Sequence, residues 1–349
     1  MTAREYPVFT VTPKAERSLR AGHPWVYGEE VTAVEGAYQN GDMVDVVSNK
    51  GRYLGTGWVN DHSKIRVRII SRNANDTFDE AFFRRRVCYA LNYRKTVMGP
   101  VDYRCCRLIF GEADQFPGLT VDRFENILVT QVLSLGMERR KDWVYRALVE
   151  LLREDGEQID AIYERNDVTI RTLEGLEQGK GFYQMEGLRT DLSGHVTITE
   201  NGIKYDVDYI EGQKTGFFLD QKYNRQAAAK LARGRRVLDC FTHTGAFALN
   251  AAAAGAEHVT AVDVSAFALE LAAENGKRNG LTNLDYKCAD VFDLLTEMAK
   301  EKKCDYDYII LDPPAFTKSR ATAKNAYHGY KEINRKAMRL LRPAPAPIL

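Results

Sequence analysis

The stretch Arg235–Asp263, RRVLDCFTHTGAFALNAAAAGAEHVTAVD, decides the fold of this 349-residue chain. The segment Val237–Asp239, two apolar residues followed by an aspartate, predicts a short buried strand that ends in a carboxylate. The segment Thr242–Gly245 predicts a tight turn. The alanine-rich segment Ala246–Ala254 predicts a helix packed closely on a sheet, and Val259–Val262 predicts the next strand, again followed by an acid. A strand, helix and strand of this length form a right-handed crossover, so the two strands are expected to run parallel.

Acidic side chains follow three successive predicted strands, at Asp239, Asp263 and Asp290. Ligands of open parallel sheets bind beyond the carboxyl ends of the strands, so these acids are expected to converge with the turn that carries Thr242, Thr244 and Gly245. A carboxylate can accept both hydroxyl hydrogens of a ribose, whereas a turn with one glycine is not the glycine-rich cradle of a dinucleotide. Alternatively, each of these aspartates could simply cap the helix that follows its strand, without binding a ligand. Three acids at three strand ends favour a nucleoside site without phosphates.

The segment Asp312–Phe316, Asp-Pro-Pro-Ala-Phe, follows an apolar strand predicted at Tyr308–Leu311. Its two prolines fix the backbone and remove two amide donors, so the Asp312 side chain and the nearby carbonyls remain as hydrogen-bond acceptors. Rigid acceptors can hold the amino edge of a planar base, and an aromatic ring can stack on that base. We therefore expect Asp312, Pro313 and Phe316 to form the catalytic loop.

These motifs together resemble those of class I S-adenosylmethionine (SAM)-dependent methyltransferases. The run Gly212–Gln221, Gly-Gln-Lys-Thr-Gly-Phe-Phe-Leu-Asp-Gln, extends the resemblance to the ribosomal RNA large subunit methyltransferase I family. The resemblance implies a Rossmann-like α/β domain, SAM as cofactor, and methylation of cytosine C5 in 23S rRNA. It also implies that Phe218 and Arg225 lie near the methionine end of the cofactor. The expected cofactor site then comprises Phe218, Arg225, Asp239, Thr242, Thr244, Gly245, Asp263 and Asp290.

The composition is that of a soluble globular protein of two or three domains, with 44% hydrophobic and 28% charged residues. The six cysteines include no Cys-x-x-Cys pair, which argues against a metal site or a disulfide framework and fits a reducing cytoplasm. No stretch approaches the length of a membrane span. A net charge of +1 does not indicate a nucleic-acid-binding protein, so a surface for rRNA must be local. The sequence leaves a homodimer open.

Short predicted strands separated by Gly, Asn and Asp fill residues 1–72, which is the pattern of a small β-barrel. The run Ile65–Ile70 alternates, which places Arg66 and Arg68 on one face of its strand. The segment Lys14–Trp25 resembles the start of a PUA domain, a small RNA-binding barrel. This resemblance implies phosphate contacts, although each side chain could equally belong to a solvated face. The arginines concerned are Arg17, Arg20, Arg66 and Arg68.

Residues 73–188 are expected to form a central α+β domain that recognises RNA, and residues 189–349 the methyltransferase domain. The run Phe82–Thr96 has the apolar spacing of a helix and carries Arg84 and Arg85, which face either solvent or rRNA. The hairpin Phe110–Arg123 resembles one in the central domain of the family.

The sequence departs from the family after Pro343, where the family continues to a strand that ends at a nucleophilic cysteine. C5 of a neutral cytosine is a weak carbon nucleophile, so its methylation requires prior addition of a thiolate at C6. Residues 344–349, Ala-Pro-Ala-Pro-Ile-Leu, cannot form a central strand, and no cysteine stands at the required position. We therefore expect a truncated chain with an incomplete sheet, an open apolar edge at Tyr308–Leu311, weak or no SAM binding, and no C5 methylation.

Three other functions stay open from the sequence. Methylation of an exocyclic base nitrogen needs no cysteine and would suit Asp312. A second is an rRNA-binding protein that has lost catalysis, which retained rRNA affinity without methyl transfer would support. A nicotinamide-dependent oxidoreductase is disfavoured by the missing glycine fingerprint.

Overall fold

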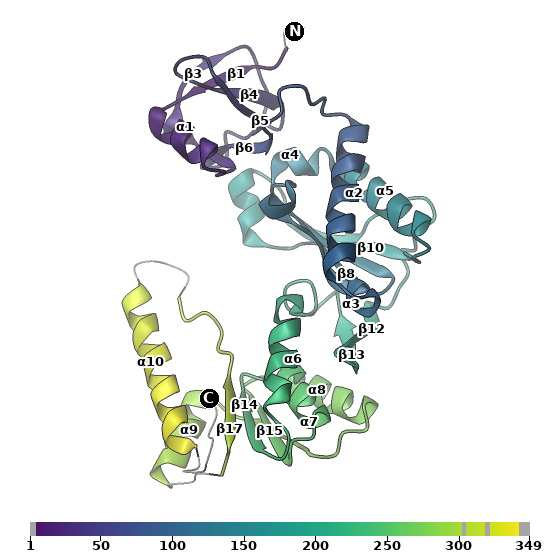
Figure 1. Ribbon diagram of the computed structural model, residues 1–349, viewed down its shortest axis with the longest axis vertical. Coiled ribbons are helices and arrows are strands. Elements are labelled where there is room, and N and C mark those ends of the chain that lie inside the picture. The colour runs from purple at the N-terminus through teal and green to yellow at the C-terminus, as the bar shows by residue number, and fades with distance from the viewer. Residues whose placement is uncertain (1–4, 302–304, 318–321, 342–349) are drawn as a thin grey trace. The chain divides into compact units, whose positions relative to one another are not determined.

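The computed structural model describes residues 5–301, 305–317 and 322–341 (Figure 1). The chain divides into two compact units, one made of residues 1–196 and 207–217 and the other of residues 197–206 and 218–349. The proline-rich ending, on which the expectation of a truncated chain depends, lies outside the described residues.

A six-stranded sheet in the order β2-β6-β5-β4-β1-β3 opens the first unit. Its neighbouring strands are antiparallel except for the parallel pair of β1 and β4. Alternate side chains of the strands point inward and share one buried core with Leu19 of the first helix. The elements are β1 (Val8–Val11), α1 (Pro13–Arg20), β2 (Trp25–Tyr27), β3 (Val31–Glu35), β4 (Met43–Ser48), β5 (Tyr53–Val59) and β6 (Ile65–Ser71).

A second sheet of the first unit has five strands in the order β11-β10-β9-β8-β7. Helices α2 and α5 pack side by side on it, and their apolar stripes join the side chains of the sheet in the largest core (Figure 1). The elements are α2 (Glu80–Val97), α3 (Pro100–Tyr103), β7 (Cys105–Phe110), η2 (Gly111–Asp114), β8 (Leu119–Phe124), β9 (Ile127–Val132), α4 (Leu135–Glu138), α5 (Lys141–Glu154), β10 (Ala161–Asn166), η3 (Thr169–Glu174) and β11 (Gly179–Phe182).

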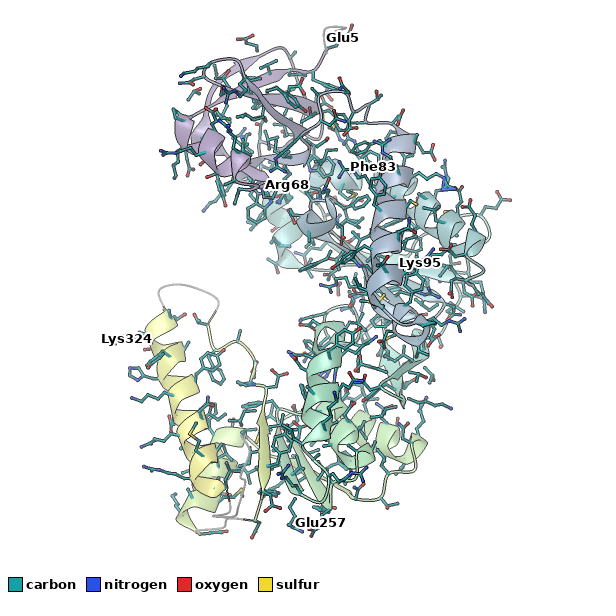
Figure 2. The ribbon with its side chains drawn as sticks, in the orientation of Figure 1. Glu5, Arg68, Phe83, Lys95, Glu257 and Lys324 are labelled. Atoms are coloured by element: carbon teal, nitrogen blue, oxygen red, sulfur yellow. The ribbon has the colours of Figure 1, made fainter. Side chains whose placement is uncertain are left out.

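Buried polar contacts join these two sheets within the first unit. Arg68 of β6, labelled in Figure 2, pairs with Glu174 at 2.7 Å and with Glu112 at 3.3 Å. A Cβ on Gly136 of α4 would lie 1.9 Å from Cγ of Trp58 in β5, so only glycine permits this approach. The barrel is thereby packed against the central sheet.

The second unit is built on four parallel strands in the order β16-β15-β14-β17. Apolar side chains on one face pack with α9 and α10, and those on the other face pack with α7. The predicted crossover, the parallel strands and the α/β fold class are confirmed. The elements are η4 (Leu219–Gln221), α6 (Lys222–Lys230), β14 (Arg236–Cys240), α7 (Ala246–Ala253), β15 (His258–Asp263), α8 (Ala266–Arg278), β16 (Leu284–Cys288), α9 (Val291–Lys300), β17 (Tyr308–Leu311) and α10 (Ala323–Leu340).

Strand β17 is an outer strand of this sheet among the described residues. Its side chains are nevertheless buried, with Ile309 at 0% exposure against Ile333 of α10. The expected open edge agrees with this position, because no described strand pairs with the outer side of β17, while α10 covers one face of the strand and α7 the other.

The hairpin of β12 (His195–Glu200) and β13 (Ile203–Asp208) precedes this sheet. Its two-residue turn has positive φ at Asn201 (54°) and Gly202 (80°), the geometry expected of an Asn-Gly hairpin. Asn275 of α8 accepts a hydrogen bond from the amide of Asp206 at 2.9 Å, which ties the hairpin to the helices of the second unit.

Candidate cofactor site

Asp239 at the end of β14 is buried and organises the turn that follows it. Its Oδ2 accepts hydrogen bonds from the Thr242 hydroxyl at 2.5 Å and from the Ala248 amide at 2.9 Å. Burial raises the pKa of Asp239 to about 7, against the lowering effect of these two hydrogen bonds. The carboxyl group therefore fixes the turn and the first turn of α7.

The turn itself has left-handed backbone at alternate residues, with φ of 64° at Phe241, 51° at His243 and 82° at Gly245. Two of the three are not glycine, and such residues keep this conformation only where their surroundings impose it. Asp263 contributes that restraint, because its Oδ2 accepts from the His243 amide and its Oδ1 from the Ser265 amide, both at 2.9 Å. Each oxygen has room for a further hydrogen bond, and the side chain is only half-buried.

Asp290 lies after β16, the neighbour of β15 in the sheet. Its exposed carboxylate accepts from the Asp293 amide at 3.1 Å and caps α9. Asp239, Asp263 and Asp290 therefore all hold backbone amides of the segment that follows their strands. Because they also stand at the same edge of a parallel sheet, the capping role and a place beside a ligand are compatible.

Arg225 is buried and bonded to other protein groups, unlike a residue that contacts a ligand directly. It is 1% exposed, its Nε lies 3.2 Å from Glu200 Oε1, and its Nη1 donates to the Phe218 carbonyl at 3.2 Å. We infer that Arg225 acts by positioning the Phe218 backbone. The ring of Phe218 meets His243 edge-on, with centroids 5.4 Å apart.

Two members of this cluster, Glu200 and His243, have no signal in the sequence that marks them as site residues. Glu200 belongs to an ordinary hairpin, and only the fold brings it to Arg225. His243 lies inside the turn, where burial lowers its pKa below the usual value and favours the neutral ring.

The segment after β17 is tied to α10 by Tyr330. Its hydroxyl accepts from the Phe316 amide at 3.3 Å and donates to the Pro314 carbonyl at 3.5 Å. The rings of Phe316 and Tyr330 lie 4.4 Å apart at 36°, and Gly329 lets the helix approach, since a Cβ there would come within 3.2 Å of the Phe316 ring. Asp312 is exposed and Pro313 is half-buried. The sequence analysis missed Tyr330 as the partner of this loop.

The six arginines predicted to bind RNA have different surroundings in the first unit. Arg17 and Arg20 are exposed on α1. Arg66 pairs with Asp61, Arg84 with Glu154 and Arg85 with Asp76. Arg68 has only 11% of its side chain exposed and is neutralised by Glu112 and Glu174, so we assign it a structural role in place of the predicted phosphate contact.

Acceptors dominate the edge of the sheet in the second unit. Asp263, Asp290 and Asp312 supply carboxylates, and Arg225, the buried cation beside them, is paired with Glu200. This set does not suit a pyrophosphate, but it fits a ligand with ribose hydroxyls and amino groups, as SAM has. Within residues 5–301, 305–317 and 322–341, no group of three His, Cys, Asp or Glu side chains could hold a metal ion. In the same residues, no helix has the length and hydropathy needed to cross a membrane.

Comparison with known proteins agrees with this chemistry. Residues 9–72 match a PUA-like domain, and residues 183–348 match the model of an S-adenosylmethionine-dependent methyltransferase. The protein is thus a SAM-dependent methyltransferase with a PUA-like domain near its N-terminus, and SAM is its cofactor. It is 42% identical over 331 residues, 94% of this chain and 81% of the relative, to the ribosomal RNA large subunit methyltransferase I of Photobacterium profundum. The chain belongs to the ribosomal RNA large subunit methyltransferase I family.

Other relatives with the same name give similar values. The protein from Shewanella denitrificans is 42% identical over 335 residues, 95% of this chain and 82% of the relative. Among solved structures, a protein from Streptococcus mutans described as a SAM-dependent methyltransferase has a TM-score of 0.76 at 23% identity, and covers 96% of this chain and 82% of its own. A methyltransferase solved with SAH has a TM-score of 0.78 at 23% identity, covering 96% of this chain and 83% of its own. These two structures establish the likeness of fold.

Proposed function

We propose that the site at the carboxyl edge of the second unit serves methyl transfer from SAM to cytosine C5 in 23S rRNA, and that residues 1–349 by themselves are impaired in this reaction. The observation that carries the proposal is the strained turn at residues 241–245, held by Asp239 and Asp263 beside the Asp312 loop. Relatives at 42% identity are named as ribosomal RNA large subunit methyltransferases, which supports rRNA as the substrate.

Each part of the site has a role in this proposal. SAM supplies an electrophilic methyl group on a sulfonium. Asp263 would accept hydrogen bonds from the ribose hydroxyls, Asp290 would accept one from the adenine amino group, and Arg225 would keep the Phe218 backbone in place. Thr242, Thr244 and Gly245 would shape the turn against the cofactor.

The Asp312 loop is the proposed binding place for the target base. The Asp312 carboxylate and the carbonyls around Pro313 accept hydrogen bonds from the exocyclic amino group of cytosine. Phe316 would stack on the base, and Tyr330 supports the proposal because it holds Phe316 by both ring and backbone.

The surroundings of the cysteines support the proposed impairment. Addition to C6 of cytosine requires a thiolate beside the base. Burial raises the pKa of Cys240 far above its usual value. Cys288 is exposed, but β16 is three strands away from β17 in the sheet, about 14 Å at the usual strand spacing. Neither thiol of the described part of the second unit is therefore suited to the task, and Cys304 lies outside the described residues.

The rRNA is proposed to contact exposed arginines of the first unit, of which Arg17 and Arg20 have the most open side chains. The boundaries 1–72, 73–188 and 189–349 for the barrel, the central domain and the methyltransferase domain stay predictions, as does a homodimer. A substrate of this kind would be met in the cytoplasm.

A second candidate is methylation of an exocyclic nitrogen of an RNA base. The absence of a suitable thiol near β17 among the described residues, together with the acceptors around Asp312, favours it, because an amine is itself the nucleophile. Without either reaction, the protein would act as an rRNA-binding protein only.

The experiment that tests these proposals incubates the chain with methyl-labelled SAM and unmodified 23S rRNA, followed by nucleoside digestion and mass spectrometry. Asp312→Ala is the matched variant. Because no described thiol of the second unit is suited to add to C6, we expect labelled 5-methylcytosine at a trace level at most, and none in Asp312→Ala. A labelled N-methylated base would replace the first candidate with the second. If no nucleoside is labelled but the chain still binds rRNA, both methylation proposals fail and only the rRNA-binding function remains.

A further inference from the structure

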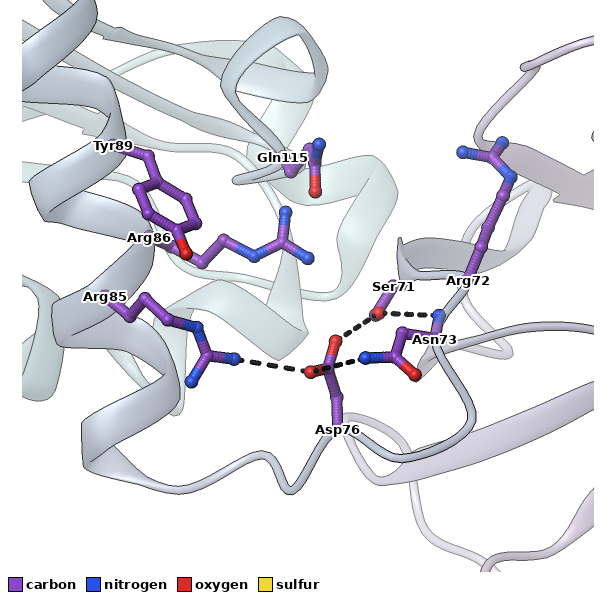
Figure 3. A pocket seen from close by; sticks show the side chains of 8 residues that line it. All are labelled: Ser71, Arg72, Asn73, Asp76, Arg85, Arg86, Tyr89 and Gln115. Atoms are coloured by element: carbon purple, nitrogen blue, oxygen red, sulfur yellow. Dashed lines mark hydrogen bonds and ion pairs between the residues drawn. The ribbon is translucent and has the colours of Figure 1, made fainter.

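A cavity of about 580 Å³ is lined by residues of the first unit alone, none of which is assigned to the cofactor (Figure 3). One wall is the segment that leaves β6, residues 71–76, and the other is the exposed side of α2. Its volume is in the usual range for small-ligand sites, about 300–1,000 Å³. The polar residues on both walls indicate a hydrophilic ligand.

The cavity carries a net charge of +2, because its lining includes three arginines, Arg72, Arg85 and Arg86, and a single acid, Asp76. Asp76 is shared between Arg85 at 3.3 Å, Asn73 at 3.2 Å and Ser71 at 2.5 Å. Arg72 and Arg86 donate to neutral backbone carbonyls, those of His23 at 3.2 Å and Ile70 at 3.3 Å. Asp76 offsets part of the charge of Arg86, and the remaining positive charge of the cavity is available to an anion that enters it.

Arg86 has the most to gain from such an anion. It extends from α2 into the space between the two walls (Figure 3). Burial lowers the pKa of Arg86, against the raising effect of Asp76, and the neighbouring charge of Arg85 lowers it further. A phosphate between these two guanidinium groups would relieve both effects.

An exposed aromatic ring accompanies the charges. Tyr89, one turn along α2 from Arg85 and Arg86, has 59% of its surface exposed. The carboxamides of Asn73 and Gln115 are also exposed at the rim, and each offers a donor and an acceptor to the edge of a base. Aromatic rings and guanidinium planes are the surfaces on which proteins stack bases splayed out of single-stranded RNA.

We propose that this cavity binds one nucleotide of a single-stranded RNA segment, with its phosphate between Arg85 and Arg86 and its base against Tyr89. The choice of RNA as ligand rests on the proposed function. Duplex RNA keeps its bases stacked and could reach only the arginines. An acidic protein segment would use the charge but leave Tyr89 and the two carboxamides without a role.

The neighbouring arginine of the same helix offers a matched control. Arg84 was also predicted to bind RNA, but it pairs with Glu154 at 2.7 Å and does not line the cavity, so this proposal assigns it no phosphate contact. Removing Arg84 or Arg85 changes the net charge of the protein equally. A difference between the two variants therefore reports on the cavity and not on the general field of the protein.

The test measures binding of a fluorescent single-stranded RNA to the full chain by anisotropy over a range of salt concentrations, with thermal unfolding to check each variant. We expect Arg85→Ala and Tyr89→Ala each to weaken binding about tenfold, and Tyr89→Phe and Arg84→Ala to bind within about twofold of wild type. Arg85→Ala should also reduce, by about 1, the slope of the logarithm of the binding constant against the logarithm of the salt concentration. Photo-crosslinking with 4-thiouridine RNA should label the peptide that contains Tyr89.

The outcomes separate this proposal from the proposed function. Equal affinities for Arg84→Ala and Arg85→Ala, with no crosslink at Tyr89, would overturn the cavity as an RNA site while rRNA binding elsewhere stands. Failure of the wild-type chain to bind RNA at all would overturn both. If uridine monophosphate competes as strongly as unlabelled RNA, the ligand of the cavity is a free nucleotide and not an RNA segment. Equal competition by a glutamate peptide and failure of Tyr89→Ala to weaken binding would overturn base recognition.

Discussion

The carboxylates of Asp239 and Asp263 in the second unit and the buried guanidinium of Arg68 in the first are all held by hydrogen bonds or ion pairs, but their partners differ. Asp239 and Asp263 accept hydrogen bonds from the loops next to their own strands. Arg68 is held by Glu112 and Glu174, from segments 44 and 106 residues away along the chain. The first arrangement shapes a local turn and leaves acceptor capacity at Asp263, whereas the second joins two sheets and uses up the charge.

This difference teaches that a charged side chain is available to a ligand only if its neighbours leave some of its bonding capacity unused. Asp263 still has room for two hydrogen bonds beyond those from His243 and Ser265. The Arg68 guanidinium faces two carboxylates and has little exposed surface. We therefore expect substitutions at Arg68 to affect stability and substitutions at Asp263 to affect ligand binding.

Arg68→Ala should have the largest effect on stability. It leaves Glu174 buried without its cation, and breaking such a pair destabilises proteins by about 3–5 kcal/mol. Urea unfolding of Arg68→Ala and of the control Arg66→Ala, which removes a half-exposed pair with Asp61, measures the difference. Unchanged stability of Arg68→Ala with weaker RNA binding would make Arg68 a phosphate contact after all.

Asp239→Asn should remove a pH dependence of stability. The pKa of Asp239 is about 7 in the folded protein and near 3.8 when unfolded, so the folded state binds the proton more tightly. Stability from this group is then present below pH 3.8 and is lost as the pH rises to about 7, by on the order of 4 kcal/mol. Asn at this position stays neutral, so the stability of the variant relative to wild type should increase across that window. A constant difference between the two proteins would show that Asp239 titrates normally.

Gly245→Ala should distort the turn that Asp263 holds. It places a side chain at φ of 82°, with the new Cβ 2.9 Å from Cβ of Ala272. We expect a loss of about 1–3 kcal/mol in the free energy of unfolding and weaker SAM binding. Gly234→Ala is the control, because Gly234 also has positive φ (68°) but nothing lies within 4 Å of its Cβ position. Similar losses in both variants would attribute the effect to backbone conformation alone.

Arg17→Ala and Arg20→Ala should have the smallest effects on folding. Both side chains are exposed, and the pair of Arg20 with Glu16 spans 3.9 Å, so the change in stability should stay within about 0.5 kcal/mol. If both touch phosphates, each substitution lowers the salt slope of rRNA binding by about 1. Binding isotherms at several salt concentrations decide this, and unchanged slopes would remove α1 from the RNA surface.

The sequence predicted the second unit better than the first. Parallel topology places the ends of successive strands at one edge, so the positions of Asp239, Asp263 and Asp290 follow once the strands are recognised. The alternation of residues along β6 indicated the face of the strand on which the Arg68 side chain lies. It did not indicate that Arg68 would form ion pairs with two glutamates from distant segments. Pairing over such separations depends on tertiary packing, which one sequence does not reveal.

Within the site, the same distinction separates what was found from what was missed. The Asp312 loop was recognisable from its two prolines. Its partner Tyr330 belongs to α10, which begins after the loop, and nothing in the sequence distinguishes Tyr330 from other exposed aromatic residues. Arg225 was expected beside the cofactor but is buried against Glu200, because the hairpin supplies an acid that nothing in its own pattern marks. The 71–76 segment, which no motif in the sequence marks, forms one wall of the charged cavity.

The most direct measurement of the central claim is calorimetric titration of SAM into the wild-type chain, Asp263→Ala and Asp285→Ala. Asp285 is a control acid on β16 that pairs with His258 at the other end of the strands. The account predicts that Asp263→Ala weakens SAM binding about 10- to 100-fold, the value of a charged hydrogen-bonding group, and that Asp285→Ala leaves it unchanged. Equal affinities of wild type and Asp263→Ala for SAM would contradict a cofactor site at the carboxyl edge of this sheet.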